Sequence, residues 1–263
     1  MPLTITVVDA FTDKPFSGNP AAVCVLPGEK SKDWMQKVAR EMNLAETAFL
    51  LLRADHVALR WFTPTTEVDL CGHATIASAH AMWENHVLPE GQPIRFRTRS
   101  GELHAERDGD WIALDFPALP SQHADLPPGL SDALGARPRA VSKYKFDYLI
   151  ELDSEAAVRD LTPDLGVIAQ LPVRGVVVTA VATTPGFDFV SRFFAPAVGV
   201  PEDPVTGSAH CALAPYWAGK LGKTEFLAYQ ASPRGGVVKV AVKGDRVALC
   251  GKAVTMLRAE LVA

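Results

Sequence analysis

The sequence lacks the apolar run of about 20 residues that a membrane-spanning helix needs. Its first residues, Met-Pro-Leu-Thr-Ile, also lack the basic start and long apolar stretch of a signal peptide. Basic residues are scattered, and 26 Lys and Arg stand against 30 Asp and Glu for a net charge of −4, so no basic stripe can follow a phosphate backbone. We therefore expect a cytoplasmic protein that has neither a membrane nor a nucleic acid as its partner.

Motifs for metals and cofactors are missing as well. The cysteines are Cys24, Cys71, Cys211 and Cys250. They form no Cys-x-x-Cys pair, which favours free thiols over a zinc site or a redox disulfide. His73 lies near Cys71 and His210 next to Cys211, but each pair places too few ligands on one helical face for a metal. Neither Gly-x-Gly-x-x-Gly nor Gly-x-x-x-x-Gly-Lys-Ser/Thr occurs, so we expect no metal and no cofactor.

What the sequence does contain is a set of motifs that occurs twice in the same order. Its 263 residues, 48% hydrophobic and 21% charged, are enough for two globular lobes. Arg-Trp-Phe-Thr-Pro at 60–64 returns as Arg-Phe-Phe-Ala-Pro at 192–196, and Cys-Gly-His-Ala at 71–74 returns as Thr-Gly-Ser-Ala at 206–209. Gly101 and Gly109 recur as Gly236 and Gly244, within alternating segments that resemble hairpins with Asp-Gly or Lys-Gly turns. The repeat predicts a duplicated lobe.

Each half reads as mixed α+β, with short strands around one helix that opens with glycine. Candidate strands are Thr4–Ala10, Ala21–Leu26, Thr47–Leu52 and His56–Phe62. The central helices are expected to run from 71 to about 85 and from 206 to about 221. Ser31 can cap a further helix whose apolar face holds Trp34, Met35, Val38 and Met42.

The proline-rich segment Pro117–Pro138 is expected to interrupt regular structure and to connect the lobes. We place the first lobe at residues 1–118 and the second at 119–263. The alternative is that the last strand, near Met256 to Leu261, returns to the first lobe.

Glu46 is the first candidate for chemistry, because it opens the apolar run Thr47–Leu52. A carboxyl group in apolar surroundings can stay partly protonated near neutral pH and can then both donate and accept a proton. The alternative interpretation is a glutamate at a strand end that faces water.

The two helix starts are the second candidate. Each presents unpaired backbone N–H groups and the positive end of the helix dipole, so Gly72-His73 and Gly207-Ser208 could together hold a substrate carboxylate. His73 could also shuttle a proton. Asp203 could orient His73 or bind an amine on the substrate. The plain alternatives are ordinary helix starts and, for Asp203, a turn residue before proline.

The residues together resemble the phenazine-biosynthesis PhzF-like proteins, which are related in fold to diaminopimelate epimerase. The resemblance spans nearly the whole chain. It is carried by Asp-Ala-Phe-Thr at 9–12, Gly-Asn-Pro at 18–20, Glu-Thr-Ala-Phe at 46–49, Cys-Gly-His-Ala-Thr at 71–75 and Glu-Asp-Pro-Val-Thr-Gly-Ser-Ala at 202–209. It implies two pseudo-symmetric lobes, each a β-barrel-like sheet around a central helix, with the active site between them and a homodimeric assembly.

The resemblance also implies an activity: a cofactor-independent isomerase in which Glu46 is the general acid and base. His73, Asp203 and Ser208 would line its site, and Gly72, Gly207 and Asn19 would bind a small carboxylate substrate. Neither the substrate nor the pathway can be read from the sequence.

Two alternatives stay open. One is a racemase or epimerase that uses Cys71, although Thr206 stands where such enzymes place their second cysteine and its hydroxyl is a far weaker base. The other is a non-catalytic protein that binds carboxylates in the same cleft.

Overall fold

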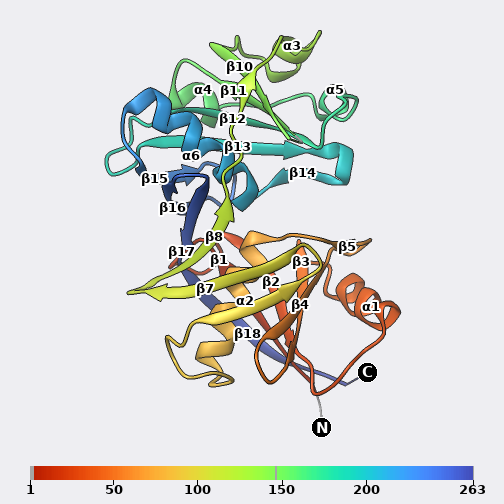
Figure 1. The fold of residues 1–263 in the computed structure, drawn as a ribbon. Coiled ribbons are helices and arrows are strands. Elements are labelled where there is room, and N and C mark those ends of the chain that lie inside the picture. Colours follow the sequence, from red (N-terminus) through yellow and green to blue (C-terminus); the bar gives the residue numbers. More distant parts are fainter. Residues whose placement is uncertain (1–2, 146, 263) are drawn as a thin grey trace. The chain divides into compact units, whose positions relative to one another are not determined.

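The computed structural model describes residues 3–145 and 147–262, which form two compact units. One unit comprises Met1–Asp115 with Cys250–Ala263, and the other comprises Phe116–Leu249 (Figure 1). The last strand, β18 (Ala253–Leu261), pairs antiparallel with β1 (Leu3–Ala10), so the C-terminal strand joins the sheet of the first unit. Among the described residues, no helix is both long and apolar enough to cross a membrane.

The elements of the first half of the chain are β1, β2 (Asn19–Val25), α1 (Lys32–Met42), β3 (Glu46–Leu52), β4 (Val57–Phe62), β5 (Glu67–Val68), α2 (Gly72–Glu84), β6 (Ile94–Thr98), β7 (Gly101–Asp108) and β8 (Trp111–Pro117). The four predicted strands and the two predicted helices in this half are confirmed, with ends that shift by one or two residues. Ser31 caps α1 as predicted, because its hydroxyl accepts a hydrogen bond from the N–H of Trp34 at 3.2 Å.

The second half adds β9 (Gln122–His123), α3 (Leu130–Leu134), β10 (Ala140–Tyr144), β11 (Asp147–Glu151), α4 (Glu155–Arg159), α5 (Leu165–Ile168), β12 (Gly175–Val181), β13 (Phe189–Ala195), a 3₁₀ turn (Pro196–Val198), β14 (Val200–Asp203), α6 (Gly207–Leu221), β15 (Glu225–Gln230), β16 (Gly236–Lys243) and β17 (Arg246–Gly251). The predicted helix after 206 is therefore confirmed as well.

The strand pairings show the repeat directly. In the first unit β1–β2 is antiparallel, β2–β3 parallel, β3–β4 antiparallel, β4–β6 parallel and β6–β7 antiparallel. In the second unit β10–β11, β11–β12, β12–β13, β13–β15 and β15–β16 follow the same order of antiparallel and parallel pairs. The central helix α2 lies between β4 and β6, and α6 lies between β13 and β15, so each follows the fourth strand of this order. The duplicated motifs therefore mark a duplicated fold.

The proline-rich segment is less irregular than expected. It holds the two-residue strand β9 and the short helix α3, and the residues around these two elements are irregular. Pro127 and Pro128 stand just ahead of α3, where proline does not interfere with helical hydrogen bonds. Gly129 caps this helix with a φ of 77°, a backbone conformation that glycine adopts easily.

The central helix α2 is buried on nearly all sides. Nearly every residue from His73 to Trp83 is buried, against strands β1, β2, β3, β7 and β18. Alanines at 74, 77, 79 and 81 let the strands approach closely, and such a helix must lie inside a sheet that curves around it. In the second unit, α6 is buried in the same way against β15 and β16.

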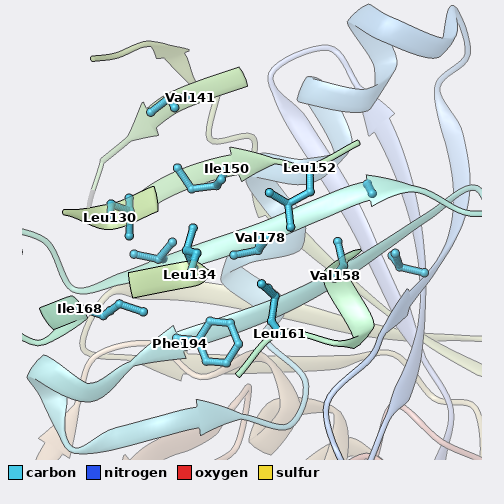
Figure 2. Packing of buried hydrophobic residues seen from close by; sticks show 13 residues of the cluster. Leu130, Leu134, Val141, Ile150, Leu152, Val158, Leu161, Ile168, Val178 and Phe194 are labelled. Atoms are coloured by element: carbon cyan, nitrogen blue, oxygen red, sulfur yellow. The ribbon is translucent and has the colours of Figure 1, made fainter. Parts of the chain in front are cut away.

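A second apolar cluster in the Phe116–Leu249 unit covers the other face of its sheet. Figure 2 shows Leu130, Leu134, Ile168 and Leu161 of the short helices and loops packing on Val178 and its neighbouring strands. The short helices α3, α4 and α5 therefore hold their places through tertiary packing, because helices of four or five residues are not stable alone.

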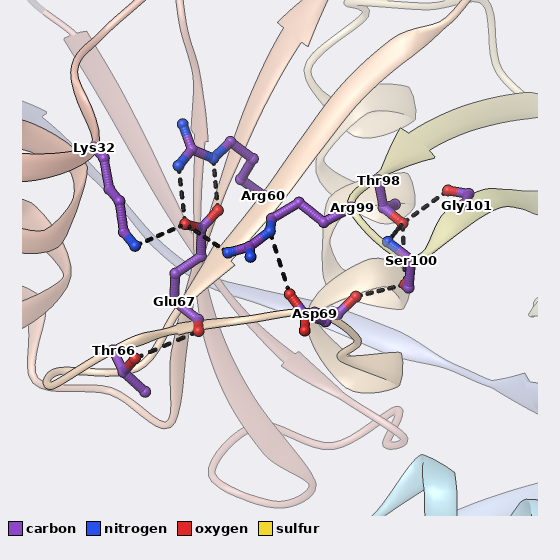
Figure 3. A network of polar contacts seen from close by, with 9 residues as sticks. All are labelled: Lys32, Arg60, Thr66, Glu67, Asp69, Thr98, Arg99, Ser100 and Gly101. Atoms are coloured by element: carbon purple, nitrogen blue, oxygen red, sulfur yellow. Dashed lines mark hydrogen bonds and ion pairs between the residues drawn. The ribbon is translucent and has the colours of Figure 1, made fainter.

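The motif Arg-x-Phe, which occurs in both halves, holds the loop before each central helix. Arg60 on β4 donates two hydrogen bonds to Glu67, of 2.7 and 3.0 Å, and Lys32 and Arg99 contact the same carboxylate (Figure 3). Only 2% of the Glu67 side chain is exposed, and the Arg60 hydrogen bonds hold its pKa below the usual value. In the other unit Arg192 donates two bonds to Glu202, of 2.7 and 2.9 Å.

Glu155, the first residue of α4, is a further buried carboxylate. It accepts the backbone N–H groups of Thr183 and Thr184 at 2.6 and 2.8 Å, their two hydroxyls, and an ion pair from Arg159. Burial alone would raise the pKa of Glu155, but the hydrogen bonds from Thr184 and Thr183 and from Arg159 lower it from 4.5 to about 2.

This depressed pKa predicts a specific loss of stability in acid. The ionised Glu155 contributes fully to the free energy of unfolding above pH 4.5. This contribution is lost as the pH falls toward 2, because the unfolded chain binds the proton more tightly than the folded one. Between neutral pH and about pH 3, the free energy of unfolding of the wild type should fall by on the order of 2 kcal/mol more than that of Glu155→Gln. Urea unfolding of both proteins at the two pH values measures this difference, and equal losses would contradict it.

Candidate active site

Glu46 lies at the first position of β3, beside the start of α2. Its side chain is 18% exposed, so the carboxyl group is largely buried but still reached by solvent. Oε2 lies 3.0 Å from Nε2 of His73, although the pair is not aligned as a hydrogen bond in the resting structure. Oε1 has no hydrogen-bond partner among residues 3–145 and 147–262. One carboxylate oxygen therefore faces the imidazole and the other is available to a substrate.

His73 is the second residue of α2 and is buried. Its Nδ1 faces the side-chain amide of Asn19 at 3.2 Å, and its Nε2 faces Glu46. The Sγ of Cys71 lies 3.5 Å from Nδ1 and 4.0 Å from Nε2. Three of the predicted residues, Asn19, Glu46 and His73, thus lie together, and Gly72 opens the helix that carries His73.

The turn before Asn19 explains how that side chain reaches His73. Gly18 has a φ of +67°, and a Cβ there would lie 2.2 Å from the carbonyl oxygen of Ala10. Only glycine allows the chain to pass so close to the end of β1. Asn19 then enters β2 opposite Ala10 and is fully buried.

The charges around His73 decide its ionisation. Burial alone would lower the pKa of His73, but its interactions with Cys71 and Glu46 raise it well above the ordinary value. Burial raises the pKa of Cys71, Glu46 raises it further, and His73 acts in the opposite direction. Cys71 therefore remains a thiol near neutral pH.

Cys71, Glu46 and His73 are also the group in which a metal could be considered. Their potential ligand atoms lie within 4.8 Å of one another. A zinc-binding cysteine must be a thiolate, so a metal here would have to remove the thiol proton that burial holds on Cys71.

The predicted residues Asp203, Gly207 and Ser208 lie in the other unit, around the start of α6. Thr206 is the N-cap of α6, but its hydroxyl donates to Asp203 at 2.6 Å instead of capping the helix. Gln230, which is buried at the end of β15, accepts the N–H of Thr206 at 2.9 Å and donates to the carbonyl of Asp203 at 2.7 Å. These bonds fix the loop that carries Asp203.

Ser208 has a partner that the sequence did not indicate. Arg174, just before β12, donates a hydrogen bond to its hydroxyl at 3.1 Å, and Asp147 on β11 holds the same guanidinium through both carboxylate oxygens. Because arginine only donates, the Ser208 oxygen must accept this bond and its own proton points elsewhere. Arg174 and Asp147 are 27 residues apart and belong to no local motif.

Comparison with known proteins gives the family. The sequence profile described as phenazine biosynthesis-like protein matches residues 8–259. An uncharacterized isomerase of Halalkalibacterium halodurans is 57% identical over 263 residues, covering 100% of this chain and 99% of that protein. The chain belongs to the phenazine biosynthesis-like family. The isomerase class predicted from the sequence is thereby confirmed.

Other members and the structures agree. An uncharacterized isomerase of Pseudomonas aeruginosa is 50% identical over 99% of both chains. A crystal structure of a PhzF-family protein from Enterococcus faecalis superimposes with a TM-score of 0.96 at 39% identity, covering both chains fully. A probable proline racemase from Agrobacterium radiobacter, at 14% identity over 99% of this chain and 93% of that one, has a TM-score of 0.65 and so shares the fold. The predicted fold class is confirmed.

Proposed function

We propose that this isomerase shifts a proton between carbons of a small carboxylate-bearing metabolite, with Glu46 as general acid and base. The observation that carries the proposal is the position of Glu46: Oε2 faces His73 at 3.0 Å, and Oε1 has no protein partner among the described residues. A carboxylate placed in this way can take a proton from one carbon with Oε1 and return it to another. No cofactor is required for such a shift.

The helix starts are assigned to substrate binding. Cys71 does not cap α2 with its side chain, and Thr206 does not cap α6. The first-turn N–H groups of each helix can therefore bind a carboxylate oxygen, and the helix dipole favours the negative charge. Gly72 and Gly207 are the first residues of these helices and add no side chain beside the N–H groups. A bound carboxylate would also favour proton removal at the adjacent carbon.

Asp203 enters the proposal as the second acidic residue of the reaction. Its Oδ2 accepts the Thr206 hydroxyl, so the carboxylate is held in one orientation. A carboxylate of this kind can bind an amine or hydroxyl of the substrate.

Solvent-deuterium incorporation tests the proposed function. The enzyme is incubated in D₂O with a panel of small carboxylates that includes anthranilate-like and amino-acid compounds, and mass spectrometry records the deuterium gained at carbon. The proposal expects exchange on at least one compound and expects it to depend on Glu46, with a smaller loss for Asp203→Asn. Exchange that survives in Glu46→Gln would contradict it, and absence of exchange on the whole panel would exclude these substrate classes.

A racemase that uses Cys71 is the second candidate, favoured by the contact of Cys71 with His73 and by the fold shared with the proline racemase. The raised pKa of Cys71 and the threonine at the N-cap of α6 both weaken it. We therefore expect Cys71→Ala to retain deuterium exchange within about three-fold of the wild type, well short of the 10²-fold or greater loss that removal of an acid–base group causes. A loss of that size in Cys71→Ala would support the racemase instead.

A further inference from the structure

The side chain of Asn19 meets a ring nitrogen of His73. Asn19 and His73 are 54 residues apart, both are buried, and the amide nitrogen Nδ2 lies 3.2 Å from Nδ1. No other side-chain hydrogen bond joins β2 to α2 among the interactions described. The contact therefore ties the start of β2 to the first turn of the central helix.

The chemistry of the two groups fixes the direction of this bond. An amide nitrogen can only donate, so in the neutral ring Nδ1 must accept this bond and carries no proton. In the neutral imidazole the one remaining proton is then on Nε2. Nε2 is the nitrogen that lies 3.0 Å from Oε2 of Glu46.

Cys71, the other neighbour of Nδ1, favours the same arrangement. Its Sγ lies 3.5 Å from Nδ1, and a protonated thiol is a donor. The titratable groups that act on His73 are Cys71, at the start of α2, and Glu46, on β3. Nδ1 therefore faces two donors, whereas Nε2 faces an acceptor.

We propose that Asn19 is a positioning residue, which makes Nδ1 of His73 the nitrogen that gives up its proton when the ring becomes neutral and so keeps the remaining proton on Nε2, on the side of Glu46. This inference rests on the proposed function and gives the two carboxylate oxygens of Glu46 separate roles. In this division the Nε2 proton of His73 stays beside Oε2, 3.0 Å away, and the proton of the substrate is carried by Oε1. Asn19 acts on the reaction through His73 and does not need to touch the substrate.

The state of the ring can be measured without a substrate. Protein labelled with ¹⁵N-histidine gives separate NMR signals for protonated and bare ring nitrogens, and His73→Gln assigns those of His73. Because the pKa of His73 is raised, spectra are recorded from roughly pH 6 to pH 10. We expect Nδ1 to be the nitrogen that loses its proton, while Nε2 keeps its own.

Two variants of Asn19 and one of Cys71 make the test specific. Asn19→Asp has the same shape but only accepts, so Nδ1 should stay protonated over the whole range. Asn19→Leu has neither donor nor acceptor, so both neutral forms of the ring should appear. Cys71→Ala removes the other neighbour of Nδ1 and should leave the wild-type pattern intact. Circular dichroism establishes that each variant is folded.

Several results would overturn the proposal. A bare Nε2 in the wild type would do so, as would a ring that stays doubly protonated over the whole range or a wild-type pattern in folded Asn19→Leu. The wild-type spectrum decides even if no Asn19 variant folds. Such a result would leave the dependence of exchange on Glu46 untouched, whereas an active Glu46→Gln would overturn the proposed function and leave the ring state unaffected.

Discussion

Glu46→Gln is expected to lower substrate deuterium exchange by about 10²–10⁴-fold, the usual contribution of a positioned acid–base group. The amide has the shape of the carboxylate but can neither take up nor release a proton at neutral pH. The fold should survive, because the side chain is partly exposed and, among the residues that the structure describes, its ion-pair contact is with His73. Exchange rates measured on one substrate at one pH, together with thermal unfolding, separate the loss of chemistry from a loss of structure.

The matched control is Glu41→Gln. Glu41 is exposed in the last turn of α1, five residues before Glu46. Its substitution by glutamine removes the same charge from the surface of the same unit. Its exchange rate should equal that of the wild type. A Glu46→Gln protein that exchanges within ten-fold of Glu41→Gln would exclude Glu46 as the acid and base.

Local elements of the fold were predictable because their signals lie within a few residues of one another. The Ser31 cap, the apolar face of α1 and the two helices that begin with glycine all depend on spacings of three or four residues. The duplication was visible for the same reason, since short motifs returned in one order. The short helix α3 in the proline-rich segment could not be placed from the sequence, because five residues carry too weak a periodic signal.

The contacts within the candidate site were less accessible to sequence reasoning. Asn19 could be named as a site residue, but its contact with His73 depends on where β2 lies against α2, across 54 residues of sequence. Arg174 and Asp147 gave no signal, because an arginine before one strand and an aspartate at the start of another meet only through the parallel pairing of β11 with β12. Long-range pairing of this kind is set by the whole fold.

Arg192→Met is expected to lower the free energy of unfolding by about 3–5 kcal/mol, as breaking one side of a buried ion pair does. Only 8% of Arg192 is exposed. Its guanidinium donates two hydrogen bonds to Glu202 and others to the carbonyls of Leu161 and Arg159, at 2.7 and 3.2 Å. Methionine fills a similar volume but leaves the Glu202 carboxylate and these carbonyls without donors in a partly buried place. Urea unfolding of the wild type and of Arg192→Met measures the difference in their free energies of unfolding.

Arg95→Met is the control for this effect. Arg95 contacts Asp55, and the two side chains are 42% and 70% exposed, so water replaces the lost partner and the expected cost is below about 1 kcal/mol. Arg192→Lys should fall between the two, because lysine keeps the charge but cannot reproduce the two parallel bonds to Glu202. If Arg192→Met costs no more than Arg95→Met, the repeated arginine–glutamate pair does not stabilise the loop before α6, and the repeat must have another cause.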